Sequence, residues 1–424
     1  TTATAAFISA NSDVHGISTA VLQPSRAVGV QAGAGGDRIA NAGSIASSAS
    51  PEASATTRAE GGGHLDNDAD AESAAAIDGI AAIGIDAGAG DNEIWNGGTV
   101  TASAAPKAAA IAGANAHGFS GAGAGATAII SNTTAIGIVS RGAASVVLNE
   151  GHIGVSVDAQ AQTSAWTSPG WAGGQNFFYS QAEVRGNEAI GIWTGGGFDT
   201  VLNSGSIDVA SVATTIGHAD GAAYGLRLDG KAQVENTGGL TARSTATSYW
   251  QSAAEAYGMR LGDSADAQAS RVTTAGTIEA AAVATGWFGT ADSTAVGVAS
   301  QGESELHNAG SIQATATARG GSVVGMAEAQ SHGAMLGQGR NTVSNAGDIT
   351  VRAEAAGGFL IGRVSGKALA IGIGSGDGGS RIVNEGRIVV DAVSSGEATA
   401  VGIRTGSGDD LIVNQGSIVA TRTV

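Results

Sequence analysis

The sequence GSGDDLIVNQGSI at residues 406–418 contains the pattern that decides the fold, and variants of it recur along the whole chain. The shared core is I/V-x-N-x-G-x-I/V, and ten copies lie 30 to 55 residues apart. One copy carries Thr274 in place of the asparagine. The others carry Asn41, Asn96, Asn149, Asn203, Asn236, Asn308, Asn345, Asn384 and Asn414. A repeat at this spacing predicts a stack of similar structural units.

Aliphatic residues flank each asparagine at fixed distances, as Ile412 and Ile418 flank Asn414. Residues an even number apart share one face of an extended chain, so we expect the asparagine and both aliphatics to point inward. Stacked copies would then let each amide bond its neighbours above and below, as an internal ladder. The alternative, an ordinary surface Asn-Gly turn, does not explain the fixed aliphatic positions.

A second block, A-x-G-I/V, precedes the first in each copy, from Ala27-Val28-Gly29-Val30 to Ala400-Val401-Gly402-Ile403. Together the blocks predict three short strands per repeat, and no helical period of useful length accompanies them. Parallel pairing of each strand with its next copy gives an all-β fold, a single parallel β-helix (β-solenoid) of about 10–13 coils. We expect one continuous solenoid over residues 1–424, with long-insertion coils over about 1–205 and shorter coils over about 206–424.

The bulky residues of the second block alternate with Ala and Gly. We expect the bulky ones to point inward, which would leave a flat Ala/Gly stripe outside. The chain length varies between the third strand and the next second block, most at residues 50–70, 105–125 and 160–181. Insertions in a solenoid usually form loops on one edge, and we expect long loops here. Residues 108–130 are regular enough to predict an additional coil.

The composition limits the partners. Twenty basic and 37 acidic residues give a net charge of −17, which repels nucleic acid, so no nucleic-acid partner is expected. The chain has no cysteine, which excludes disulfides and cysteine-bound metals. No run of 18 apolar residues occurs, so no transmembrane segment is expected.

Gly-rich acidic turns precede several ladder positions, as in Gly33-Ala34-Gly35-Gly36-Asp37. They resemble the G-x-G-x-D half of the calcium-binding nonapeptide of RTX proteins, although these turns occur once per coil rather than in tandem. The resemblance implies calcium at Asp37, Asp199, Asp409 and Asp410. The alternative is that the carboxylate caps a glycine turn through its own backbone. The pattern requires no cofactor.

Aromatic residues gather in the inserted segments, although they make up only 4% of the chain. An exposed strip of aromatic rings would suit a protein or glycan partner. The candidate contact residues are Trp166, Trp171, Phe178, Trp250, Trp287 and Phe288. The alternative, which we favour at this point, is that the segments fold back and bury these rings.

Catalytic patterns are weak. The chain has three lysines, and its histidines do not form an H-E-x-x-H motif. Residues 225–231 have the G-x-x-x-x-G-K form of a phosphate-binding loop, but Ala232 replaces the required Ser or Thr. We therefore expect that the protein is not an enzyme, and a polysaccharide-active β-helix enzyme is the least favoured interpretation.

The N-x-G-x-I core with its upstream A-x-G-I block resembles the repeats of autotransporter passenger domains and haemagglutinin-like adhesins of Gram-negative bacteria, from about Ala27 to Ala420. The resemblance implies an extracellular or cell-surface location and an adhesive role toward a host surface, a cell surface or a glycan. It departs from the family after Ile418, where no translocator barrel pattern follows.

A second interpretation is a self-assembling subunit of an extracellular filament or surface layer. The sequence begins at Thr1 without Met, and both of its ends have the pattern of ordinary strands. Terminal coils without caps can stack end to end, so self-association, end-to-end or lateral, is an expected partner mode.

Overall fold

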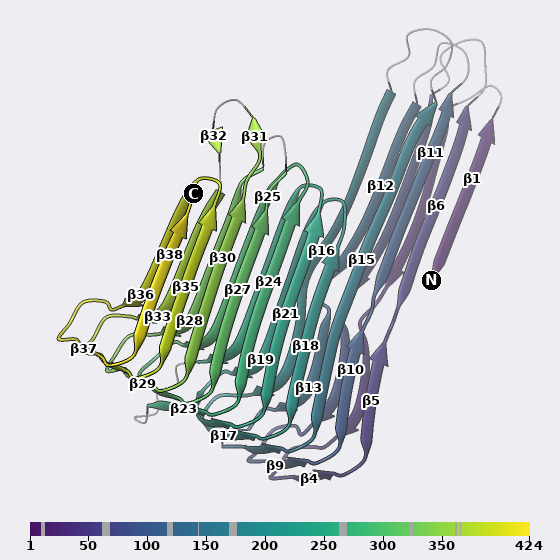
Figure 1. Cartoon of the computed structure of the whole chain (residues 1–424). Helices are drawn as coiled ribbons and strands as arrows, with labels where there is room; N and C mark the ends of the chain where they lie inside the picture. Colours follow the sequence, from purple (N-terminus) through teal and green to yellow (C-terminus); the bar gives the residue numbers. More distant parts are fainter. Residues whose placement is uncertain are drawn as a thin grey trace.

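The computed structural model describes residues 1–9, 13–61, 68–116, 122–142, 144–168, 176–262, 269–321, 325–360, 363–364 and 366–424. All regular structure in these residues is β, and the strands form three parallel sheets that run along a solenoid (Figure 1). The predicted parallel β-solenoid is therefore confirmed. Within the same residues, no helix is long and apolar enough to cross a membrane.

Each sheet collects one kind of strand from successive coils. The first sheet contains β1 (Thr2–Ser9), β5 (Ser44–Ala49), β6 (Glu52–Gly61), β10 (Thr99–Ala104), β11 (Lys107–Ala116), β15 (His152–Ser168), β18 (Ser206–Thr214), β21 (Gly239–Ser248), β24 (Thr277–Gly286), β27 (Ser311–Arg319), β30 (Asp348–Ala356), β35 (Arg387–Ser394) and β38 (Ser417–Thr423). The second contains β2 (Val14–Leu22), β3 (Ser25–Gln31), β7 (Ala69–Asp78), β8 (Ile80–Asp86), β12 (Ala122–Ser131), β13 (Thr134–Ser140), β16 (Asn176–Thr194), β19 (His218–Leu228), β22 (Gln251–Leu261), β25 (Thr290–Ser300), β28 (Ala327–Leu336), β33 (Gly366–Ser375) and β36 (Glu397–Arg404).

The third sheet contains the I/V-x-N strands, one from each coil. These are β4 (Arg38–Asn41), β9 (Glu93–Asn96), β14 (Val146–Asn149), β17 (Phe198–Asn203), β20 (Lys231–Asn236), β23 (Ser270–Thr274), β26 (Ser304–Asn308), β29 (Thr342–Asn345), β34 (Arg381–Asn384) and β37 (Leu411–Asn414). A coil is therefore a second-sheet, a third-sheet and a first-sheet strand in that order, as the three sequence blocks predict. One short antiparallel pair, β31 (Phe359–Leu360) and β32 (Arg363–Val364), lies outside the three sheets.

The long insertions are strands, and the prediction of long loops was wrong. β6 and β11 extend the first sheet, β7 and β12 extend the second, and in the next coil β15 and β16 run through without a break. Together with β1 and β2 they form a two-layer arm, which rises beyond the edge of the later, shorter coils (Figure 1). The additional coil predicted at residues 108–130 is also absent, because β11 and β12 pair only as extensions of neighbouring coils.

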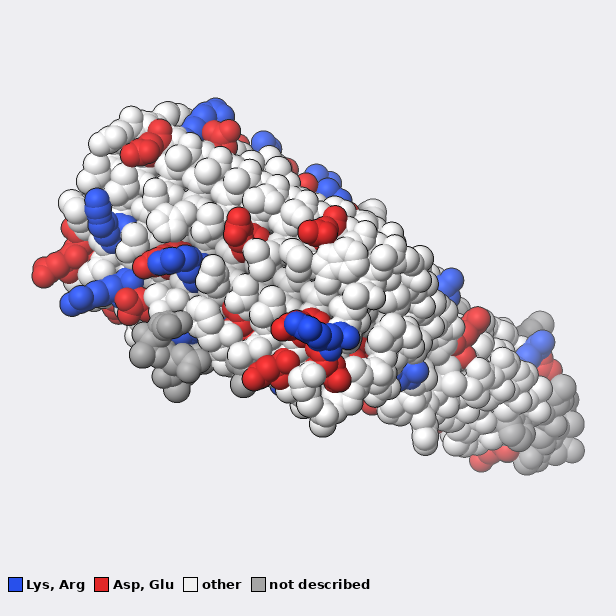
Figure 2. Space-filling model, turned by 90° about the horizontal axis from the view of Figure 1, so that it is seen from below, with Lys and Arg blue, Asp and Glu red and all other residues white. Residues whose placement is uncertain are grey.

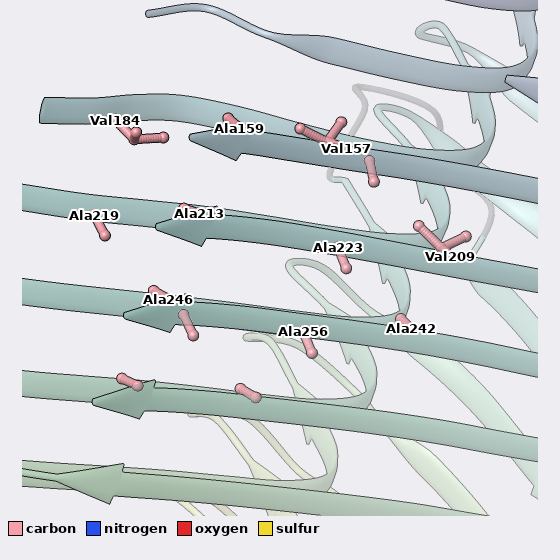
Figure 3. Packing of buried hydrophobic residues seen from close by; sticks show 14 of the residues in the cluster. Val157, Ala159, Val184, Val209, Ala213, Ala219, Ala223, Ala242, Ala246 and Ala256 are labelled. Carbon is pink, nitrogen blue, oxygen red and sulfur yellow. The ribbon is translucent and has the colours of Figure 1, made fainter. Parts of the chain in front are cut away.

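Alanine fills most of the space between the first and second sheets, in the arm and in the solenoid alike. Figure 3 shows this for facing strands, with Ala213 and Ala246 on one sheet and Ala219 and Ala256 on the other. In the arm, the Thr57 hydroxyl of the first sheet donates to the Glu72 carbonyl of the second at 2.5 Å. The threonine side chain is short, so its hydroxyl reaches the backbone of the opposite sheet only where the two sheets lie close together. Small residues therefore set the distance between the sheets.

The A-x-G-I block lies in the second sheet; its last aliphatic residue points inward as predicted, but its first two residues face opposite to the prediction. In β19, Ala223 and Leu226 belong to the main interior, whereas Tyr224 packs in a separate apolar cluster with Ile190 and Ile136. The pairing register explains the change, because it passes from Tyr224 to Leu226 and omits Gly225. The chain bends at this glycine, so the alternation of faces is broken and the expected outer Ala/Gly stripe does not form.

The glycine at the bend has no room for a side chain. A Cβ on Gly225 would lie 2.2 Å from Cδ2 of Leu240 and 2.6 Å from the carbonyl oxygen of Gly258, the equivalent glycine of the next coil. Gly137 has the same restriction, because a Cβ there would lie 2.4 Å from Cγ2 of Ile153. The bulky inward residue of the first sheet thus fits only because the second sheet has no side chain there.

We expect Gly225→Ala to destabilise the fold by about 1–3 kcal/mol, because the new methyl group overpacks against Leu240 and against backbone that cannot move independently of the stack. Gly196→Ala is the matched control, since nothing lies within 4 Å of a Cβ at that position. Urea unfolding followed by circular dichroism measures both. Equal unfolding midpoints for the two variants would contradict the proposed packing constraint.

Candidate functional site

The asparagine side chains form the predicted ladder. The Nδ2 atom of Asn41 donates to Oδ1 of Asn96 at 2.8 Å, and Asn96 donates to Asn149 at 2.8 Å. The series continues with Asn149 to Asn203 at 2.7 Å and Asn203 to Asn236 at 2.8 Å. After Asn308 the distances are 2.7 Å in the steps to Asn345, Asn384 and Asn414. The ladder is buried through most of its length, so each amide relies on its neighbours for hydrogen bonds.

Thr274 continues the ladder with a weaker contact. Its hydroxyl accepts from Nδ2 of Asn236 at 3.2 Å, and a hydroxyl has fewer bonding positions than an amide. The backbone arrangement is unchanged at this coil, because the Thr274 carbonyl accepts from the N–H groups of Ala309 and Gly310, just as the ladder asparagine carbonyls from Asn41 to Asn384 accept from the next coil. The corner is thus fixed by the backbone, and the side-chain ladder adds to it.

Replacing one inner asparagine interrupts two steps of the ladder. Asn203→Ala leaves Nδ2 of Asn149 and Oδ1 of Asn236 without their partners, and we expect a loss of about 2 kcal/mol or more in unfolding free energy. Ser204→Ala, on the neighbouring exposed side chain, serves as the control and should change little. Chemical denaturation of the two variants compares them directly, and a stable Asn203→Ala protein would argue against a stabilising role for the ladder.

A second polar column lies four residues before the ladder, in the turn between the second and third sheets. Here a side-chain oxygen accepts the backbone N–H of the equivalent residue in the preceding coil. Asn92 accepts from Asp37 at 3.0 Å, Asp199 from Ser145 at 2.8 Å, and Asp410 from Ser380 at 2.9 Å. Asp, Asn and Ser are therefore interchangeable at this position, because each offers an oxygen to the turn.

The structure separates the residues predicted for calcium. Asp37 and Asp199 occupy the same column, but the coils of β9 and β14 lie between them, and Asp410 lies at the far end of the third sheet. Asp409 is exposed, next to Asp410. Over the described residues, no group of three or more His, Asp or Glu side chains is arranged to hold a metal ion. The Asp199 and Asp410 carboxylates accept an N–H group of the preceding coil, whereas the alternative assumed an N–H group of their own turn, and calcium binding stays a prediction.

Asp199 is the most deeply placed carboxylate in this column, with no exposed surface. Burial raises its pKa above the usual range, and this effect outweighs the hydrogen bond from the Ser145 N–H, which lowers it. A buried carboxyl at a position where other coils carry Asn or Ser is a cost to stability when ionised.

The candidate aromatic residues are exposed, and the favoured prediction of buried rings was wrong. Phe178 is 71% exposed, Trp250 61%, Trp287 58% and Phe288 48%. Trp166 is 41% exposed and lies flat over Gly113 of the neighbouring strand, where a Cβ would come within 2.2 Å of the indole. Trp171 lies outside the described residues.

Four of the rings form a continuous surface cluster, which we call the aromatic edge: Tyr249, Trp250, Trp287 and Phe288. They lie in the turns that follow β21 and β24, so two adjacent coils contribute two rings each. Tyr249 stacks on Trp287 at 6.2 Å and on Phe288 at 5.7 Å between ring centroids, and Trp250 lies 6.4 Å from Phe288. The regular spacing of coils therefore converts two sequence pairs into one apolar patch.

Tyrosine and arginine side chains stack in a row on the outer face of the second sheet. This row was not predicted, because the tyrosines of the A-x-G-I block were expected to point inward. Tyr224 and Tyr257 stack with a centroid separation of 5.3 Å. The Arg227 guanidinium lies over both Trp193 and Tyr224, and Arg260 lies over both tyrosines. The signal in the sequence was the repeated A-Y-G pair, which places two tyrosines at the same position in adjacent coils.

His332 occupies the same outward row, between Val296 and Ile371 of the adjacent coils. It is only 8% exposed, and burial, with a smaller contribution from Arg404, lowers its pKa to about 4. A histidine with this pKa is neutral at physiological pH.

The position of His332 makes the fold acid-sensitive. Because the folded-state pKa lies below the unfolded value of 6.5, the unfolded chain takes up a proton first, and stability falls as the pH drops from 6.5 to about 4. We expect this histidine to account for about 3 kcal/mol of the loss. His332→Val, which matches the aliphatic row, should remove this component from unfolding free energies measured across the range. An unchanged pH dependence would contradict the assignment.

Two hollows of about 360 Å³ each open on the outer faces. The first is apolar and lies over the third sheet, where Trp95, Val146 and Leu148 line it and the indole N–H donates to Glu150 at 2.9 Å. The second lies beside Tyr224, with Glu188 and Glu255 at its rim. Both are shallow, and His218 and Asp220 also line the second.

Comparison with known proteins finds no matching family model, no matching curated protein and no matching solved structure.

Proposed function

We propose that the chain is a non-enzymatic adhesive solenoid, displayed at or released from a bacterial surface, which binds its partner through the aromatic edge. The single observation that carries this proposal is the exposure of four stacked rings on two adjacent coils. Contiguous exposed apolar surface is uncommon on soluble proteins and marks interaction sites, and aromatic residues contribute most of the energy at such sites.

The solenoid suits this role because it holds the rings in fixed positions. Tyr249 and Trp250 follow β21 directly, and Trp287 and Phe288 follow β24. The strands β21 and β24 pair in register along their whole length. Side chains on paired strands keep their mutual geometry without a partner, so little ordering is needed when the partner binds.

The distribution of charge suits an extended binding surface. Figure 2 shows acidic and basic side chains scattered in small mixed groups over a largely uncharged surface. Several of these groups are single ion pairs between adjacent coils, such as Arg243 with Glu279 at 3.0 Å and Arg271 with Glu305 at 2.6 Å. Ion pairs of this kind link neighbouring coils, although the 37 acidic residues of the chain outnumber the 20 basic ones.

The proposed location rests on the sequence resemblance. The N-x-G-x-I repeats are similar to those of autotransporter passenger domains and haemagglutinin-like adhesins, and the absence of cysteine is compatible with export. An acidic net charge of −17 keeps such a rod soluble in spite of its apolar edge.

The test is binding of the purified chain to a panel of immobilised oligosaccharides and extracellular-matrix proteins, measured by biolayer interferometry. We expect the triple variant Trp250→Ala/Trp287→Ala/Phe288→Ala to lose at least about tenfold in affinity for whatever the parent chain binds. Trp95→Ala, on the outer face of the third sheet, is the matched control and should bind as the parent does. Equal binding by the triple variant, or no binding to any member of the panel, would contradict the proposal.

A further inference from the structure

The arm ends in a step where two strands continue beyond their neighbours. β18 pairs with β15 only up to Gln160, and β19 pairs with β16 only from Glu183 onward. Among the described residues, the strands that pair with the outer parts of β15 and β16 lie on one side only, namely β11 and β12. We call these two stretches, Gln162–Ser168 and Asn176–Gln181, the ledge.

The backbone of the ledge presents free hydrogen-bonding groups. The N–H of Gln160 bonds to the Pro106 carbonyl in the preceding coil at 3.1 Å. In a parallel strand, successive residues direct their N–H and C=O groups to opposite sides. Thr163, Ala165 and Thr167 therefore direct theirs away from β11, to the side that no strand of the described residues covers. This is the geometry to which an added strand pairs.

The side chains of the ledge do not guard this edge. Exposed strand edges are normally protected by charged residues, proline or bulges. Residues 162–168 and 176–182 contain neither a charge nor a proline. They carry Trp166 and Phe178 instead, and also Phe177 at 68% exposure and Tyr179 at 56%. A strand edge that lacks charged residues and proline and carries aromatic side chains is suited to pairing with another strand rather than to facing solvent.

The two edges are held beside each other. The Ser180 hydroxyl of β16 donates to the Thr163 hydroxyl of β15 at 2.6 Å, which joins the layers at the step. By strand alternation Phe178 shares the inward side with Ala182, yet it is exposed, because no strand covers the space next to it. A polypeptide added at the ledge would cover this ring as well as satisfy the backbone.

The chemistry of the ledge favours a polypeptide over other ligands. A glycan would use the rings alone and leave the row of N–H and C=O groups open. Within the arm, the equivalent edge of β11 is filled by β15, in parallel register with Ala112 opposite Ala165. The inward residues of β15 next to the open side, Thr163 and Ala165, are small, so a strand with small alternate residues fits the narrow interlayer space.

We propose that the ledge is a strand-addition site, which takes an extended segment of a partner polypeptide in parallel with β15 and with small residues at alternate positions. This proposal rests on the proposed adhesive function and adds a second contact surface to the aromatic edge: a protein strand bound through backbone pairing at the ledge, with Phe178 next to its side chains.

The test uses the full chain and a fluorescein-labelled peptide with the β11 sequence KAAAIAGANA, which natively pairs with β15. We expect saturable binding by fluorescence anisotropy and slower amide hydrogen exchange at Thr163, Ala165 and Thr167 when the peptide is bound. Ala165→Pro removes a donor on the open side without breaking a bond to β11, and should weaken binding at least tenfold. Ala165→Ser keeps the donor and should bind as the parent does.

A second variant, Phe178→Lys, places a charge at the edge and should also weaken binding at least tenfold. It keeps the proposal testable if the Ala165→Pro variant does not fold. Equal binding of a scrambled peptide, no saturable binding, or binding unaffected by both Ala165→Pro and Phe178→Lys would overturn the strand-addition site. If an oligosaccharide binds through the aromatic edge while the peptide shows no saturable binding, the adhesive function stands and the strand-addition proposal fails. Loss of both would remove the two proposals together.

Discussion

The hydrogen bond from one asparagine amide to the next adds to the backbone pairing between coils on which the architecture depends. It requires that equivalent residues of successive coils lie directly above one another, and the parallel register of the third sheet provides this from β4 to β37. The same register stacks the turn-capping oxygens, the bend glycines and the inward aliphatics. A residue in this fold is therefore surrounded by copies of its own position, which explains why small differences such as Thr274 are tolerated singly.

Close approach of the first and second sheets is the second constraint, and it follows from the choice of alanine. Where Ala213 and Ala246 face Ala219 and Ala256, small side chains fill the space between the two sheets, and the Ser244 hydroxyl donates to the Gly221 carbonyl of the opposite sheet at 2.7 Å. Large residues are thereby displaced to two places. Aliphatic residues fill the wider corner beside the ladder, and aromatic residues lie outside, on the turns and on the ledge. The exposed rings are thus a consequence of a thin interior that has no space for them.

The change in coil length along the chain produces the features that bear on function. Early coils carry strands that extend both sheets into the arm, and later coils end sooner, at turns that carry the aromatic edge. The boundary between the two leaves β15 and β16 with uncovered edges. A solenoid of uniform coils would have no such step in its side, because each strand would be covered by the next.

The sequence by itself determined the repeating parts of this protein. The spacing of Asn41 to Asn414 and their flanking aliphatics predicted the parallel solenoid, three strands per coil and the inward ladder, because a period-two pattern repeated in register allows few other arrangements. Only the tertiary structure decided the direction of the A-x-G-I residues, since the bend at Gly225 reverses an alternation that sequence patterns assume to be unbroken. It also decided that the insertions pair as strands and that Trp250 and Phe288 stay exposed. Both depend on contacts between coils 30 or more residues apart and on an interior width that alanine fixes, and neither quantity is encoded in any single repeat.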